Sequence, residues 1–203
     1  MLLLAACSSG KGATPNQTGL NDQPQQCSAY CGFGLTTPQP RPSFTLTDAT
    51  GKPFSFGTVT AGHPTLLFFG YTHCPDVCPE TMADVGTALA KVPVELQQKT
   101  YVVFVTTDPT RDTGSVLTQW LSNFHTADQF LNKATFVGLR GTEDEIHAAE
   151  AAVHVNLSED GGQTHSAELL LFGSDDYARV TYNSSSNEDT AIAHDLPLVD
   201  KSS

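Results

Sequence analysis

Basic residues and long hydrophobic runs are scarce in this sequence of 203 residues. It contains no stretch of about 18 or more apolar residues, so no segment has the length of a membrane-spanning helix. Lysine and arginine together number 10 against 22 aspartates and glutamates, which gives a formal net charge of -12. Because phosphate binding needs a clustered basic surface, this balance argues against a nucleic-acid partner. The excess of acid otherwise indicates solubility.

The first seven residues form a short apolar segment that ends in small residues and a cysteine. Residues 4–7 (LAAC) resemble a bacterial lipobox, whose cysteine becomes the lipidated first residue of the mature protein. The segment is too short for a whole signal peptide and lacks a positive start, so we interpret residues 1–6 as a signal-peptide remnant. A lipid on Cys7 predicts a protein anchored at the extracytoplasmic face of the bacterial cell membrane. The alternative is a hydrophobic N-terminus with an unmodified cysteine.

The chain has five cysteines, and all except Cys7 fall into two pairs with three intervening residues each. The pairs are Cys27 with Cys31 and Cys74 with Cys78. In an oxidising compartment, paired thiols are bridged, redox-active or bound to metal.

Residues 7–42 differ in composition from the rest of the chain. Beyond the first cysteine they are rich in Ser, Gly, Gln, Asn, Thr and Pro, which bury too little apolar surface to fold alone. We therefore predict a flexible tether over 7–42 and one folded domain over 43–203, with order beginning at Ser43.

Apolar runs alternate with amphipathic segments along the predicted domain. Two continuous apolar runs, 65–71 and 101–105, predict strands, and 135–139 is predicted as a further strand. Strands without polar alternation are buried on both faces, so helices must cover the central sheet. Helices are predicted at 79–91, at 114–124, from 142 onward and at 188–195. Short strands near 44–46 and 54 and a hairpin of 169–172 with 179–182 complete the pattern. The predicted fold class is α/β.

Residues 70–79 (GYTHCPDVCP) lie where the first buried strand ends and a helix begins. α/β proteins usually place ligands at this carboxyl edge of the sheet. Cys78 falls in or beside the first helical turn and Cys74 just before it, so both sulfurs can face one point. The free N–H groups of a helix N-terminus favour thiolate over thiol, which predicts better ligands and nucleophiles.

Two sulfurs predict a site for a soft ion such as Cu(I), and an added imidazole would also suit Cu(II) or zinc. Spacing alone does not choose among the seven histidines. His165 is the strongest candidate, because it lies in a polar loop directly before a predicted strand and so at a sheet edge. His73 adjoins Cys74 but should point away from it. Histidines in or near predicted helices are expected to be surface or packing residues: His147, His154 and His194.

Three separate segments resemble the Sco/SenC family of copper proteins. They are residues 70–79, residues 106–113 (TTDPTRDT) and the pair His165-Ser166, within a resemblance that covers about residues 42–196. The resemblance implies a thioredoxin-like central mixed sheet flanked by helices, with an N-terminal strand extension. It also implies one copper ion held by Cys74, Cys78 and His165. Residues 161–164 (GGQT) lack the acidic and aromatic residues that the family often carries there, so a further ligand stays open.

The resemblance implies a copper metallochaperone that delivers copper to the CuA centre of cytochrome c oxidase subunit II. The alternative is an extracytoplasmic thiol-disulfide oxidoreductase that acts on cysteines of the same or another partner, so enzymatic activity stays open. Three residues between the cysteines argue mildly against that alternative, as does the absence of proline between Asn156 and Asp176. A thiol peroxidase fits less well, because Thr72 stands one residue too close to Cys74.

The Cys27/Cys31 pair lies outside the family pattern. It is either a local disulfide that staples the tether or a second redox pair or transient copper site. No histidine lies between Met1 and Lys52, so no third ligand is near it in sequence.

Asp108 follows the second buried strand in the TTDPTRDT segment and also has two interpretations. It is either a turn residue or a group beside the copper ligands. With the turn interpretation, Arg111 and Asp112 would form a solvated ion pair.

Overall fold

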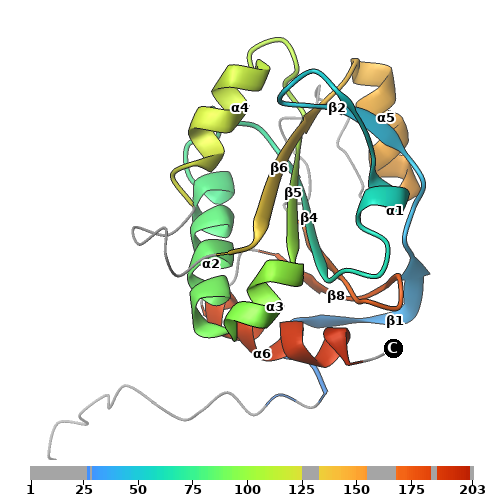
Figure 1. Ribbon diagram of the computed structural model, residues 1–203, viewed down its shortest axis with the longest axis vertical. Helices are drawn as coiled ribbons and strands as arrows, with labels where there is room; N and C mark the ends of the chain where they lie inside the picture. Colours follow the sequence, from blue (N-terminus) through green and yellow to red (C-terminus); the bar gives the residue numbers. More distant parts are fainter. Residues whose placement is uncertain (1–26, 28, 125–132, 155–167, 184–186, 202–203) are drawn as a thin grey trace, which may run out of the picture.

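The computed structural model describes residues 27, 29–124, 133–154, 168–183 and 187–201 (Figure 1). They form an eight-stranded mixed sheet flanked by helices. The strands are β1 (Phe33–Pro40), β2 (Thr45–Asp48), β3 (Pro53–Ser55), β4 (Thr65–Gly70), β5 (Tyr101–Thr106), β6 (Thr135–Arg140), β7 (Leu169–Phe172) and β8 (Tyr177–Tyr182). The helices are α1 (Phe56–Val59), α2 (Val77–Lys91), α3 (Val94–Lys99), α4 (Gly114–Leu121), α5 (Glu143–Ala152) and α6 (Glu188–Asp200).

The strand order is β1-β8-β7-β4-β5-β6-β2-β3. Strands β4, β5 and β6 run parallel in the middle of the sheet, and β7 pairs antiparallel with β4. The three parallel strands are those predicted at 65–71, 101–105 and 135–139, and all six residues of β4 are buried. Parallel neighbours need crossover connections, which α2, α3 and α4 supply. The α/β class is therefore confirmed.

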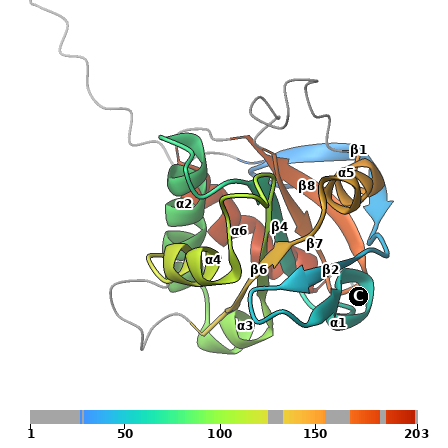
Figure 2. The ribbon, with the colours of Figure 1, turned by 90° about the horizontal axis from the view of Figure 1, so that it is seen from above.

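The side-chain alternation within β4 divides the hydrophobic core into two layers. Leu66 and Phe68 belong to the layer formed with α2, α3, α4 and α6. Leu67 and Phe69 belong to the layer formed with α1 and α5. Figure 2 shows these two groups of helices on opposite faces of the sheet. The apolar runs without polar alternation are thus explained by burial on both faces.

Strand β1 lies in the segment that the composition assigns to the tether. The sequence predicts order from Ser43, whereas Phe33–Pro40 pairs antiparallel with β8 at the edge of the sheet. Most of its side chains are exposed, so no hydrophobic pattern indicates the strand. Its prolines are tolerated because an edge strand has a ladder on one side only. The predicted signal-peptide remnant and Cys7 lie outside the described residues.

A buried arginine fastens the end of β1 to the rest of the domain. The Arg41 side chain is 2% exposed and forms an ion pair with Asp176. Its guanidinium also donates to the hydroxyl of Thr60 and to the carbonyl oxygen of Gly173. It lies 5.0 Å from the centre of the Phe172 ring, at cation–π distance. These contacts hold the chain after β1 against the loops at the ends of β4 and β7.

Most other predicted elements agree with the structure to within a few residues. Helix α6 differs most, because it passes the predicted end at residue 195 and continues through Pro197 to Asp200. Leu196 and Val199 are fully buried there, so core packing explains the continuation. None of the helices in the described part of the chain is both long and apolar enough to cross a membrane.

One buried acid makes the stability of the fold depend on pH. Glu150 in α5 is 1% exposed, and within the described residues neither of its carboxylate oxygens has a hydrogen-bond partner. Burial raises its pKa from 4.5 to about 7. The folded state therefore favours the neutral acid, and its contribution to stability is lost as the pH rises from 4.5 through 7.

We expect Glu150→Gln to remove this pH dependence, because an amide does not ionise. The wild-type free energy of unfolding should fall by about 1–3 kcal/mol more than that of the variant between pH 4.5 and pH 8. Chemical denaturation at several pH values measures the difference. Glu143→Gln, on the exposed first turn of the same helix, is the control and should follow the wild type. A parallel loss in the wild type and Glu150→Gln would contradict the prediction.

Candidate metal centre

The Cys74/Cys78 pair lies between β4 and α2, as the sequence predicts. Strand β4 ends at Gly70, the chain turns, and α2 begins at Val77. The side chain of Asp76 caps the helix by accepting a hydrogen bond from the Val77 N–H at 2.7 Å. Cys78 therefore occupies the first turn, and Cys74 stands just before the helix.

The two cysteine side chains lie together and are both free thiols. They share a side-chain hydrogen bond, and the backbone N–H of Cys78 donates to the Cys74 sulfur at 3.4 Å. Cys74 is partly exposed, whereas Cys78 is fully buried. Two adjacent soft sulfurs are able to bind a soft metal ion, to form a disulfide or to exchange thiols with another protein.

Gly70 allows the close approach of Cys78 to the end of β4. A Cβ atom at this position would lie 2.9 Å from the Cys78 sulfur and 2.9 Å from the Phe68 ring. Both distances are too short for ordinary contacts, so any larger residue would displace the sulfur or the ring. The absence of a side chain at Gly70 is thus part of the geometry of the site.

Burial has a larger effect on the pKa of the Cys78 thiol than the N-terminus of α2 has. The sequence predicts that the N-terminus of α2 favours the thiolate, but burial raises the pKa of Cys78 to about 12. The backbone hydrogen bond from Tyr71 acts in the opposite direction and offsets only part of the desolvation. The prediction of a ready thiolate is therefore wrong for Cys78, which is a thiol at neutral pH when no metal is bound.

A buried carboxylate holds the loop that carries the cysteines. Asp112 has no exposed surface and accepts hydrogen bonds from the Thr72 N–H at 3.0 Å and from the Thr72 hydroxyl. It also accepts one from the hydroxyl of Thr106 at 2.6 Å, at the end of β5. Asp112 thus connects the loop after β4 to the end of the neighbouring strand.

Asp112 is the residue whose role sequence reasoning missed. The predicted solvated ion pair between Arg111 and Asp112 is wrong, because Arg111 pairs with Asp108 instead. Asp112 needs no cation, since hydroxyl and N–H donors satisfy its oxygens. The only available signal in the sequence was the presence of several threonines near Asp112 in the TTDPTRDT segment. Threonines near an aspartate are too common to predict a buried carboxylate that connects a loop to a neighbouring strand.

Three other residues were predicted at or near this site: His73, Asp108 and His165. His73 is half-exposed, and its Nδ1 lies 3.1 Å from the Thr72 hydroxyl and 3.5 Å from Asp112. Asp108 forms its ion pair at the surface of the loop after β5, and its role beside copper stays a prediction. His165 lies outside the described residues, so its place as a third ligand also stays a prediction.

The second cysteine pair is bridged. Cys27 and Cys31 form a disulfide with a Cα–Cα distance of 4.8 Å. The backbone N–H of Cys31 donates to the carboxylate of Asp195 in α6 at 2.8 Å. The bridge is thus attached to the domain, whereas the sequence places it within a flexible tether.

The family to which this chain belongs follows from a match to a family model. The model described as SCO1/SenC matches residues 35–197, which is most of the chain. This chain belongs to the SCO1/SenC family. The matched range contains both cysteines of the candidate centre and the whole of the sheet except two residues of β1.

Curated relatives match parts of the chain. A putative copper-binding protein from Stutzerimonas stutzeri is 33% identical over 140 residues, 66% of this chain and 64% of the relative. The mitochondrial protein SCO2 from Saccharomyces cerevisiae is 37% identical over 103 residues, 51% of this chain and 31% of the relative. The chain therefore spans less than two thirds of the length of these relatives.

Solved SCO1/SenC structures share the fold. Copper-bound ScoI from Bradyrhizobium japonicum is 29% identical with a TM-score of 0.63, covering 79% of this chain and 99% of its own. Copper-bound yeast Sco1 is 26% identical with a TM-score of 0.65, covering 81% and 90%. A SCO1/SenC family lipoprotein from Bacillus anthracis has the same fold at 23% identity and a TM-score of 0.63. The thioredoxin-like prediction is confirmed.

Proposed function

We propose that this SCO1/SenC protein is a copper metallochaperone. It binds one copper ion through the thiolates of Cys74 and Cys78 and the imidazole of His165, and it hands the ion to an acceptor. The observation that carries the proposal is the pair of free thiols sharing a hydrogen bond at the start of α2. Two soft sulfurs at one point suit Cu(I), and the relatives from B. japonicum and yeast have been solved with copper bound.

Two features of the chain affect copper binding in this proposal. They are the proton on Cys78 and the loop that Asp112 holds. Because the pKa of Cys78 is raised to about 12, copper binding must release the Cys78 proton to water. The hydrogen bonds from Thr72 and Thr106 to Asp112 hold the loop independently of any metal. Copper transfer then needs an exchange of ligands and no refolding of the site.

The acceptor in this proposal is the CuA centre of cytochrome c oxidase subunit II, which the family resemblance implies. Lipid attached to Cys7 at the extracytoplasmic face would keep the domain beside a membrane-bound acceptor. The segment that precedes β1 would then set the reach of the domain from the membrane.

One observation favours a second candidate, the thiol-disulfide oxidoreductase. Cys74 is partly exposed and Cys78 is buried beside it. An exchange reaction uses the same asymmetry, in which the accessible sulfur attacks a partner disulfide and the buried sulfur resolves the mixed disulfide. The partner would be reduced while Cys74 and Cys78 become a disulfide.

Copper stoichiometry and reductase turnover separate the two functions. The test uses the Cys27→Ser/Cys31→Ser protein, so that Cys74 and Cys78 are the remaining pair. After reduction by a phosphine, we expect one tightly bound Cu(I) per chain in competition with a colorimetric chelator. We also expect negligible reduction of insulin disulfides. Rapid insulin reduction without tight copper binding would instead establish the oxidoreductase and reject the chaperone.

A further inference from the structure

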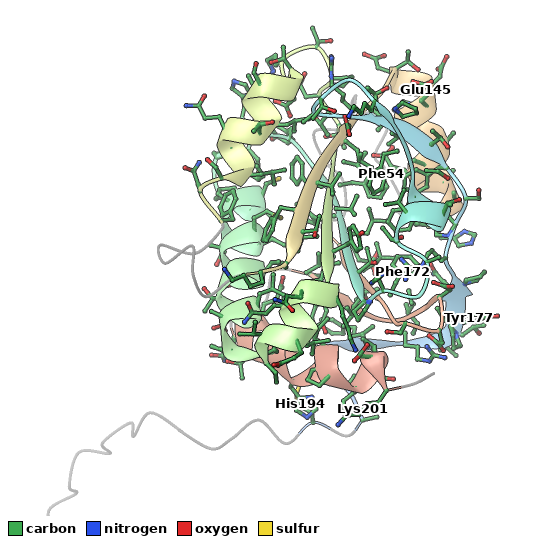
Figure 3. The ribbon with its side chains drawn as sticks, viewed as in Figure 1. Phe54, Glu145, Phe172, Tyr177, His194 and Lys201 are labelled. Atoms are coloured by element: carbon green, nitrogen blue, oxygen red, sulfur yellow. A yellow bond between two sulfur atoms is a disulfide. The ribbon has the colours of Figure 1, made fainter. Side chains whose placement is uncertain are left out.

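The Cys27–Cys31 disulfide lies beside a histidine from the other end of the chain. Sulfur atoms of both cysteines and a ring nitrogen of His194 all lie within 4.8 Å of one another. The disulfide bond explains why the two sulfurs are close together. It does not explain why the His194 imidazole lies beside them. Figure 3 shows His194 projecting from α6 at the lower end of the molecule. The fold therefore supplies the third ligand that the sequence around the cysteines lacks.

A single buried carboxylate positions both the histidine and the cysteine loop. Asp195 has no exposed surface and accepts the N–H groups of Cys31 and Gly32 at 2.8 and 2.9 Å. The hydroxyl of Tyr182 donates to it at 3.0 Å. These bonds keep Cys31 against α6 whether or not its sulfur is bridged.

The same carboxylate orients the imidazole. Nδ1 of His194 lies 2.7 Å from Oδ1 of Asp195. A carboxylate accepts, so Nδ1 carries the proton and Nε2 keeps its lone pair for a metal ion. A metal-binding histidine normally has such a carboxylate partner, which fixes its tautomer and ring orientation. The His194 side chain is 46% exposed, so an ion has access from solvent.

We propose that Cys27, Cys31 and His194 form a second Cu(I) site, which the disulfide closes and reduction opens. A dithiol reductant transfers two electrons and two protons to the bridge, leaving two thiols here and a disulfide in the reductant. Cu(I) then replaces both thiol protons, which pass to water, and binds two thiolates and the His194 imidazole. The proposed ligands are two thiolates and one imidazole, the same types that are predicted for the centre at Cys74 and Cys78. They come from three other residues of the chain.

The two sites are separate. Cys31 precedes β1, and β8 and β7 lie between β1 and β4, the strand that leads to Cys74. Three strand spacings of about 4.8 Å place the two strands about 14 Å apart. Variants that remove one cysteine pair at a time therefore count the ions at the two sites independently.

Copper counting on the full chain tests the proposal. We expect the air-oxidised Cys74→Ser/Cys78→Ser protein to bind no Cu(I) and the phosphine-reduced protein to bind one. Reduced wild type should bind one more Cu(I) than the Cys27→Ser/Cys31→Ser protein. His194→Ala should weaken the second ion at least about tenfold, since even indirect partners of a metal ligand contribute that much. The control His147→Ala removes an exposed helical histidine from α5 and should change nothing.

Each failure points to a different error. Equal copper binding by oxidised and reduced Cys74→Ser/Cys78→Ser protein, or a second ion insensitive to His194→Ala, would overturn the second site. Absence of copper in the Cys27→Ser/Cys31→Ser protein would overturn the proposed chaperone centre and leave the second site standing. Zn(II) in place of Cu(I), tested in the same proteins, would overturn the assignment to copper if zinc bound more tightly.

Discussion

Replacing Cys78 by alanine is expected to lower the affinity for Cu(I) at the chaperone centre by more than about a hundredfold, beyond the usual cost of losing an indirect partner. The two thiolates supply most of the ligand field for a soft ion, and water does not replace a sulfur. The measurement is a chelator competition in the Cys27→Ser/Cys31→Ser background, where no other cysteine pair remains. Wild-type affinity in Cys78→Ala would show that the centre is assigned to the wrong residues.

The same titration separates His165 from the cysteines. Cu(I) accepts two-coordinate thiolate ligation, so His165→Ala should weaken Cu(I) less than Cys78→Ala does. Cu(II) takes imidazole readily, so this variant should lose Cu(II) or its thiolate charge-transfer absorption. An unchanged Cu(II) spectrum would move the ligand role to another histidine, of which His73, next to Cys74, is the first to test.

Removal of the Asp112 carboxylate is expected to destabilise the domain and loosen the centre together. Asp112→Ala leaves the Thr72 N–H without its acceptor inside the protein and removes the acceptor of two hydroxyls. Unsatisfied buried donors predict a loss of about 2–4 kcal/mol in the free energy of unfolding. Urea denaturation of the metal-free protein measures this loss, and Cu(I) affinity should fall in the same variant.

Asp108→Ala is the matched control for that experiment. Asp108 lies four residues earlier in the same loop, and its ion pair with the half-exposed Arg111 is close to the surface. Such pairs contribute about 0–1 kcal/mol, so this variant should stay within that range of the wild type. Equal destabilisation by both substitutions would mean that Asp112 is an ordinary loop residue and no clamp.

The parallel centre of the fold and the position of the cysteine pair were predictable from the sequence. Strands buried on both faces leave a local signature, an apolar run without alternation, and β4 and β5 show it, whereas β6 is only partly buried. The place of Cys74 and Cys78 follows from the same local pattern, because a strand that ends directly before a helix puts them at the sheet edge.

The edge strand and the state of Cys78 were not predictable in this way. Phe33–Pro40 is held by backbone pairing with β8 and mostly exposes its side chains, so its composition resembles that of a linker. The pKa of Cys78 depends on how completely its surroundings exclude water, and residues far away in sequence decide that.

The sequence by itself determined the order of the central strands and the longer helices and the spacing of the two sulfurs, because these depend on neighbours within a few residues. Only the tertiary structure decided which distant groups meet those local elements. It brings Asp112 to the loop of Cys74, where hydroxyls rather than a cation satisfy it. It also brings His194 to Cys31, 163 positions away, because α6 packs beside the chain that leads into β1 and Asp195 binds both. Such long-range contacts depend on the path of the whole chain, and no local sequence pattern predicts them.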